Sequence, residues 1–141
     1  MAISEWRKEY NRKNREKHNE WNKKSIDKWH KTNKLRVNIS TTICNLFKER
    51  GGYKPDKSEK ILGCSWDEFK QHIESQFEPW MNWGNYGGRN IIVPNTSWDI
   101  DHIIPVSSAS TSEEILKLNH YTNLRPLCSY NNRFIKRDNL F

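Results

Sequence analysis

The sequence predicts an α+β protein, with helices over most of the chain and two short strands near its C-terminal end. Apolar residues recur at helical spacing in residues 35–50 and again in residues 66–77. Residues 98–104 and 123–128 are instead short apolar runs, and Pro105 ends the first of them. The predicted order at the C-terminal end is therefore strand, connection, strand and a final helix.

Charge divides the chain into a basic arm over residues 1–34 and a second domain over residues 35–141. Residues 1–50 carry 14 Lys and Arg against 6 Asp and Glu, whereas residues 51–141 carry 10 against 11. Hydrophobic residues make up 34% of the chain and mean hydropathy is −1.02, which is too little for a core across its whole length. The basic excess indicates a polyanionic partner, most often nucleic acid, with a solvated charged helix as the alternative.

The arm has the composition of a helix but a thin apolar stripe. Residues 4–33 contain neither Gly nor Pro, and residues 11–20 offer no apolar side chain. We predict an arm that is helical in pieces and orders best on a partner, and we identify no internal repeat. Its basic side chains are expected to contact nucleic-acid phosphates without reading sequence. The predicted contacts are Arg7, Lys8, Arg12, Lys13, Arg15 and, just beyond the arm, Arg36.

Two helices are predicted in the middle of the chain. The first spans residues 35–50 and ends at two glycines. The second follows Ser65, which lies three residues before Glu68 in the spacing of a capping box, and its apolar stripe runs to Phe77. Residues 79–97 then form a long loop with aromatic anchors, in which a short strand over Ile91 to Val93 would also fit.

Two more helices are predicted around the second strand. Thr111 and Glu114 repeat the capping-box spacing before a helix over residues 112–118. Ser129 is the predicted cap of a final helix over residues 130–138.

Four polar residues fall at places that this arrangement brings together. Asp101 and His102 end the first strand, Asn123 opens the second, and Asn132 lies on the first turn of the final helix. Asp101 and the Asn132 carbonyl are hard oxygen ligands for Mg²⁺ or Mn²⁺, and a neutral His102 can take a proton from water. Adjacent residues of a regular strand point to opposite faces, so the strand must end or distort at His102 for both to serve one site.

The segments DHIIP (101–105), TNLRPLC (122–128) and NNRFIKRDN (131–139) resemble the HNH endonucleases, the ββα-metal or His-Me finger group. The preceding ILGCSWDEF and MNWGNYGG resemble what precedes the motif in small phage-type members. The resemblance implies a C-terminal ββα-metal finger over about residues 96–139, packed with helices and preceded by a basic helical arm.

The resemblance also implies roles for the four residues. His102 is the general base, and Asp101 and Asn132 hold one divalent metal, Mg²⁺ by default with Mn²⁺ or Ni²⁺ as substitutes. Asn123 orients the histidine or shapes its loop, and Asn131 is the alternative helix ligand. Many members carry paired cysteines for a structural zinc, which this chain lacks, so packing must hold its finger. The candidates for this packing are Trp98, Ile100, Leu124, Leu127 and Phe134.

The expected function is a metal-dependent DNA endonuclease that hydrolyses phosphodiester bonds and nicks or cuts double-stranded DNA. A phage or mobile-element origin, with a homing or genome-interference role inside a bacterial host, fits the resemblance. The alternatives are a non-catalytic DNA-binding or packaging accessory protein of the same fold, a nuclease for RNA or branched DNA, and a structural domain whose arm binds a protein.

Several other residues have two interpretations. Arg125, Arg133 and Lys136 are expected to bind nucleic acid, although Lys136 also fits a solvated surface position. Trp80, Trp83 and Tyr86 are expected to anchor the long loop, with stacking on bases as the alternative. His72 is expected to lie on the surface or to pack against its neighbours, and His120 is expected to form a structural hydrogen bond, with a phosphate contact as the alternative.

Cysteine usage and hydropathy indicate the compartment. Cys44, Cys64 and Cys128 lie far apart and form no CxxC pair, which suits a reducing compartment and no zinc ribbon. No apolar segment predicts a signal peptide or a membrane span, so we expect a soluble cytoplasmic protein without a membrane partner.

Overall fold

The computed structural model describes residues 4–88 and 90–136, and the chain forms two units, residues 1–40 and 41–141. It combines helices with one small two-stranded sheet, which confirms the α+β class. The boundary between the units falls inside a helix, α2 (Lys34–Lys48), at whose start the sequence placed its own boundary.

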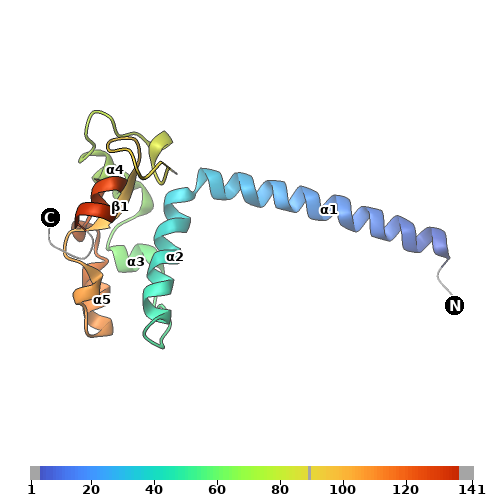
Figure 1. The fold of residues 1–141 in the computed structure, drawn as a ribbon. Helices are drawn as coiled ribbons and strands as arrows, with labels where there is room; N and C mark the ends of the chain where they lie inside the picture. Colours follow the sequence, from blue (N-terminus) through green and yellow to red (C-terminus); the bar gives the residue numbers. More distant parts are fainter. Residues whose placement is uncertain (1–3, 89, 137–141) are drawn as a thin grey trace. The chain divides into compact units, whose positions relative to one another are not determined.

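The N-terminal arm is one uninterrupted helix, α1 (Glu5–Thr32), of 28 residues (Figure 1). The prediction of a helix in pieces was therefore wrong. None of its residues is buried, so burial of an apolar stripe does not explain its continuity. Ser4 caps its first turn by accepting a hydrogen bond from the backbone N–H of Arg7.

Local side-chain pairs also stabilise α1. The guanidinium of Arg12 lies 2.7 Å from Glu9 and 2.8 Å from Glu16, one turn to either side. Trp6 stacks on Tyr10 four residues later, with ring centroids 5.4 Å apart. These contacts depend on the order of charged and aromatic residues, which counting apolar positions does not reveal.

The second unit begins with the end of α2 and two short helices. Ile43 and Phe47 of α2 are buried. The short helix α3 (Ser58–Leu62) ends at Gly63, whose φ of 79° is left-handed and whose missing Cβ leaves room for His120. A side chain at this glycine would be strained and would also meet the His120 ring.

The helix α4 (Trp66–Glu74) has the predicted capping box between Ser65 and Glu68. It ends before Phe77, which the predicted stripe included. The Phe77 ring instead packs against Trp98, at 4.9 Å between centroids. Tertiary packing therefore uses this apolar residue outside the helix.

The sheet pairs β1 (Trp98–His102) with β2 (Leu124–Cys128) in antiparallel orientation. Trp98 lies opposite Cys128 and His102 opposite Leu124. The first strand thus ends two residues earlier than predicted. The helix α5 (Ser112–Leu118) connects the strands and has both the predicted bounds and the predicted capping box.

The chain after β2 forms a π-helix over Asn131–Lys136, and the rest of the predicted final helix lies outside the described residues. The predicted cap is wrong, because the buried Ser129 hydroxyl has no hydrogen-bond partner among the described residues. The Ser129 backbone N–H instead donates to the Ser97 carbonyl at 2.9 Å, which ties the start of this segment to β1.

An aromatic cluster around Trp98 fills the space beside the sheet. Trp98 is fully buried, and its ring centroid lies 4.7 Å from Tyr86 and 5.3 Å from Trp83. This confirms that Trp83 and Tyr86 anchor the long loop. No strand forms over residues 91–93 in the described chain, where Ile92 is 73% exposed.

The other predicted packing residues divide into three groups. Leu124 is buried like Trp98, and Ile100 and Leu127 are half-buried. Phe134 is 47% exposed and lies against Tyr130, so its assignment to the core was wrong.

Short 3₁₀ turns join the main elements. They lie at Trp83–Asn85, Val106–Ser108 and Tyr121–Asn123. Within residues 4–88 and 90–136, no helix is long and apolar enough to cross a membrane.

Candidate active site

Three of the four predicted site residues line one cleft of about 590 Å³ in the second unit. Asp101 and His102 come from the end of β1, and Asn132 from the final helical segment. Arg50 and Lys136 add positive charge to its walls. Because β1 ends at His102, two adjacent residues can reach the same cleft, as the sequence required.

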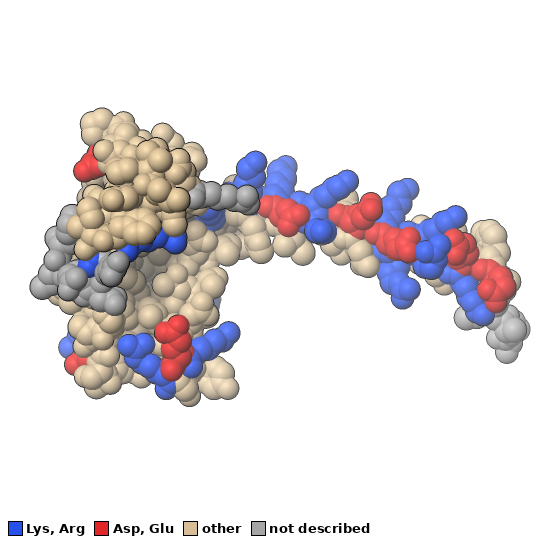
Figure 2. Space-filling view, in the orientation of Figure 1, with Lys and Arg blue, Asp and Glu red and all other residues tan. Residues whose placement is uncertain are grey.

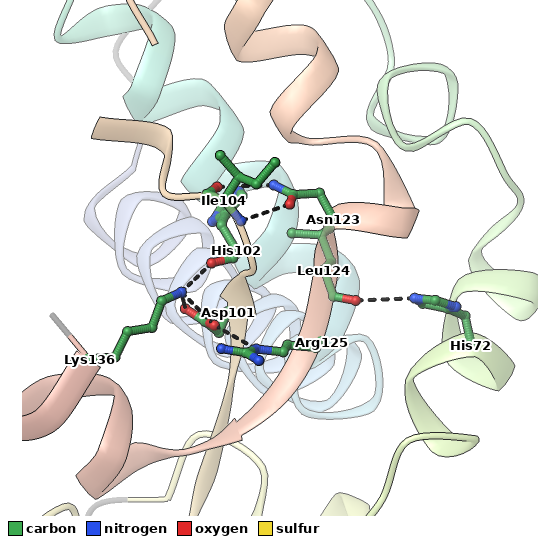
Figure 3. A network of polar contacts seen from close by, with 8 residues as sticks. All are labelled: His72, Asp101, His102, Ile104, Asn123, Leu124, Arg125 and Lys136. Atoms are coloured by element: carbon green, nitrogen blue, oxygen red, sulfur yellow. Dashed lines mark hydrogen bonds and ion pairs between the residues drawn. The ribbon is translucent and has the colours of Figure 1, made fainter. Parts of the chain in front are cut away.

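Asp101 is buried, with 6% of its surface exposed, and two cations hold its carboxylate (Figure 3). Lys136 Nζ lies 2.6 Å from Oδ1 and 2.7 Å from Oδ2, and Arg125 Nε lies 3.0 Å from Oδ2. The register of the sheet places Arg125 directly opposite Asp101. These ion pairs offset the cost of burying the carboxylate.

The buried ion pair corrects both interpretations of Lys136. Lys136 is 2% exposed, so it is neither a phosphate contact on the surface nor a solvated lysine. Its ammonium also donates to the carbonyl of His102. Arg125 is 21% exposed in its side chain and uses Nε on Asp101.

Asn119, which the sequence analysis did not select, holds the His102 ring. His102 Nε2 lies 2.8 Å from Asn119 Oδ1, and Asn119 Nδ2 donates to the Ile115 carbonyl at 2.8 Å. Because the second bond fixes Oδ1 as the acceptor, Nε2 must carry the hydrogen of the neutral ring. The lone pair of the neutral imidazole is therefore on Nδ1, the nitrogen that a general base uses.

The surroundings of His102 favour its neutral form. Burial lowers the pKa of His102 below its ordinary value, and the positive charge of Lys136 acts in the same direction. The bond to Asn119 and the charge of Asp101 oppose this shift without reversing it. At neutral pH these surroundings therefore favour the neutral ring.

Asn123 has the second of the two roles that the sequence left open, since it shapes a loop. Its Oδ1 accepts from the Ile104 N–H at 2.9 Å, and its Nδ2 donates to the Ile104 carbonyl at 3.1 Å (Figure 3). Its Nδ2 also donates to the Leu118 carbonyl at 2.8 Å. These three bonds tie the segment after β1 to the end of α5. Asn123 thus fixes the path of the chain next to His102.

The sequence contained one weak signal for Asn119. In the sequence, Asn119 directly follows the predicted helix over residues 112–118. In the structure it caps that helix and only 2% of its surface is exposed. A buried amide at a helix end needs partners, but nothing in the sequence selects His102, which lies 17 positions away.

The other histidines of this unit are structural, as predicted. His72 Nε2 lies 3.1 Å from the Leu124 carbonyl, which fastens α4 to β2 (Figure 3). His120 Nδ1 lies 2.8 Å from the Thr122 hydroxyl.

The remaining predicted nucleic-acid contacts are exposed. Arg133 is exposed in the final helical segment, and Arg36 is exposed on α2. The predicted contacts on α1 are all exposed as well, and three of them form ion pairs with neighbouring glutamates. These three are Lys8, Arg12 and Lys13.

Asp101 and Asn132 fit a divalent cation in the kind of atoms they offer. Mg²⁺ binds oxygen, retains several waters and commonly takes one or two protein ligands. The described residues contain no group of three or more His, Cys, Asp or Glu that could hold a metal, so any site here would depend on this sparse oxygen set. The Lys136 ammonium already lies among three oxygens, two from Asp101 and one from His102. The oxygens around the Asp101 carboxylate therefore accept positive charge. Lys136 must lose a contact with Asp101 if a metal ion is to bind the same carboxylate.

Comparison with known proteins gives one relative. An uncharacterized protein of Acanthamoeba polyphaga mimivirus is 35% identical over 94 residues, which are 65% of this chain and 37% of that protein. The chain thus spans little more than a third of the length of this relative. No family model matches the chain, and no solved structure matches it.

Proposed function

We propose that this protein is a metal-dependent endonuclease of the HNH type that hydrolyses phosphodiester bonds in DNA. The observation that carries the proposal is the His102 ring, which Asn119 fixes with the lone pair on Nδ1, in a residue that lines one cleft together with Asp101 and Asn132. A fixed base, a carboxylate and an amide oxygen in one open cleft are the groups that such hydrolysis needs.

The order of elements supports the same class. Two antiparallel strands are followed directly by a helical segment, and the candidate residues come from the end of β1 and the start of that segment. This agrees with the ββα arrangement that the resemblance implies for residues 96–139.

The side chains can divide the chemistry as follows. His102 Nδ1 takes the proton of the attacking water, and Asn119 keeps the ring in the required tautomer. A divalent cation held by Asp101 and Asn132 would neutralise the charge that develops on the phosphate. Asn123 holds the loop beside His102 and acts through position rather than contact.

One observation favours a second candidate, a non-catalytic DNA-binding protein of the same architecture. Both carboxylate oxygens of Asp101 accept hydrogen bonds from cationic side chains, Lys136 and Arg125. If Lys136 never yields, Asp101 is only a structural partner and the cleft holds no metal.

Cleavage of several nucleic acids separates the two candidates. Supercoiled plasmid, linear duplex, single-stranded DNA and RNA are incubated with the protein in Mg²⁺, in Mn²⁺ and in EDTA. We expect open circles from the plasmid in Mg²⁺ or Mn²⁺ and none in EDTA. Binding to these substrates without cleavage in either metal would favour the non-catalytic candidate, and cleavage of RNA alone would change the substrate class.

A further inference from the structure

The helix α1 contains an 11-residue repeat, which the sequence analysis did not identify. Residues 5–15 (EWRKEYNRKNR) and 16–26 (EKHNEWNKKSI) are identical at four positions, and Tyr10 corresponds to Trp21. Eleven residues make close to three helical turns, so residues at this spacing stay on one face of a helix. The repeat has meaning only because α1 is continuous.

The repeat arranges the side chains of α1 in two parallel stripes. All five acidic residues of the helix fall on the first, the acidic stripe: Glu5, Glu9, Glu16, Glu20 and Asp27. The residue that follows each of them lies about 100° further around the helix. These form the second, the aromatic–lysine stripe: Trp6, Tyr10, Lys17, Trp21 and Lys28.

The aromatic–lysine stripe is open to solvent. Trp6 is 72%, Tyr10 54% and Trp21 65% exposed. Neither Lys17 nor Lys28 forms an ion pair with any residue that the structure describes. In contrast, Lys8 and Arg12, off this stripe, are held by glutamates. Figure 2 shows the acidic side chains of α1 following one another along the helix between Lys and Arg.

We infer that α1 binds single-stranded nucleic acid along its aromatic–lysine stripe. A partner of this stripe must offer negative charge to Lys17 and Lys28 and flat faces to the three exposed rings. Unpaired nucleotides offer both, because phosphates pair with lysine and bases stack on Trp and Tyr. The acidic stripe repels phosphates from its own flank, which makes the binding one-sided.

The dimensions suit a strand of several nucleotides. Tyr10 and Trp21 are eleven residues apart, which is about 16 Å along a helix. Duplex DNA would satisfy the lysines but keeps its bases stacked internally, so it would offer the exposed rings no base to stack on. The inference rests on the proposed function, from which it takes nucleic acid as the partner. It adds that the bound nucleic acid is single-stranded and that the aromatic–lysine stripe is the binding face.

Two matched double variants test the face. Lys17→Gln/Lys28→Gln removes two charges from the aromatic–lysine stripe, and Lys23→Gln/Lys31→Gln removes two charges from exposed lysines elsewhere on α1. Fluorescence anisotropy of a labelled oligonucleotide in EDTA measures binding by the full chain over a range of salt concentrations. We expect the first variant to weaken binding roughly tenfold and to reduce the slope of log affinity against log salt by about 1.4, with little change in the second.

A second pair of variants tests stacking. Trp21→Leu should weaken binding to the single strand by at least about fivefold, whereas Trp29→Leu, which lies off the stripe, should not. Tryptophan fluorescence should be quenched by the single strand and not by the same sequence as duplex.

Equal losses in the two double variants would overturn the assignment of the face. Preference for duplex without quenching would overturn the strand state. A change in sedimentation of the Lys17→Gln/Lys28→Gln variant with unchanged nucleic-acid binding would identify a second copy of the chain as the partner, which also overturns the inference. Since EDTA prevents metal-dependent cleavage, these binding results do not depend on catalysis. A protein that cleaves plasmid without using the stripe would support the proposed function and contradict this inference. A protein that binds through the stripe but never cleaves would support this inference and contradict the proposed nuclease activity.

Discussion

Charged residues are organised in opposite ways in α1 and in the cleft of the second unit. In α1 the ion pairs join residues three or four positions apart, and their side chains are 48% to 88% exposed. In the cleft, Asp101 pairs with residues 24 and 35 positions away, and its side chain is 7% exposed. The first kind of pair needs only a helix, whereas the second exists only when the sheet and the final helical segment have assembled.

The largest expected effect comes from removing a lysine in each region. Lys136→Met leaves Asp101 buried with Arg125 alone and should lower the free energy of unfolding by about 3–5 kcal/mol. Lys17→Met on the exposed face of α1 should change it by less than about 0.5 kcal/mol. Urea unfolding followed by tryptophan fluorescence measures both, and similar values for the two variants would show that the buried pair is not a structural requirement.

A second prediction sharpens the comparison inside the cleft. Asn119→Ala removes the acceptor of His102 Nε2 and should lower the rate of plasmid nicking roughly a hundredfold, because the base loses its orientation. Nitrogen chemical shifts of the ring should show the loss of the Nε2–H tautomer.

Asn123→Ala is the matched control for this change. It breaks three loop bonds but none to His102, so it should reduce stability while leaving the ring tautomer unchanged. A tautomer that is insensitive to Asn119→Ala would contradict the assigned role of Asn119.

A third prediction concerns pH. The pKa of His102 is lower in the folded protein than its ordinary value of 6.5, chiefly because of burial. The unfolded chain therefore binds the proton more readily, and the free energy of unfolding should fall as pH falls through about 6.5. This dependence should be weaker in His102→Gln, as measured by urea unfolding at pH 7.5, 6.5 and 5.5. Equal slopes in the two proteins would show that His102 is not the group responsible.

The smallest expected effect is in α1. Arg12→Gln removes the pairs with both Glu9 and Glu16 and should cause a slight loss of helical circular dichroism at low salt. The loss should vanish in 1 M NaCl, where exposed ion pairs are screened. A loss that persists at high salt would mean that the pairs do not explain the continuity of α1.

The sequence predicted those parts of the fold that local signals determine. The capping boxes at Ser65 and Thr111 were visible as spacings, and a helix starts at each, although α4 ends before Phe77. The two strands and their order also followed from short apolar runs. The continuity of α1 was missed because it does not depend on apolar periodicity: none of its residues is buried, and its contacts are local ion pairs and stacked rings.

The candidate site was predictable in its members but not in its contacts. Asp101, His102 and Asn132 do line one cleft. The roles of Asn119 and Lys136 depend on contacts across 17 and 35 positions, which no spacing in the sequence encodes. The exposure of Phe134 was missed for a similar reason, because helical spacing does not tell which face of the final segment packs against the rest of the protein.

The rate of supercoiled-plasmid nicking in Mg²⁺ by wild type, His102→Ala and His30→Ala tests the central claim most directly. His30 lies exposed on α1 and provides the matched control for loss of a histidine. A base in the cleft predicts that nicking falls by about 10²–10⁴-fold in folded His102→Ala and stays at the wild-type rate in His30→Ala. Nicking by His102→Ala at the wild-type rate would contradict the account.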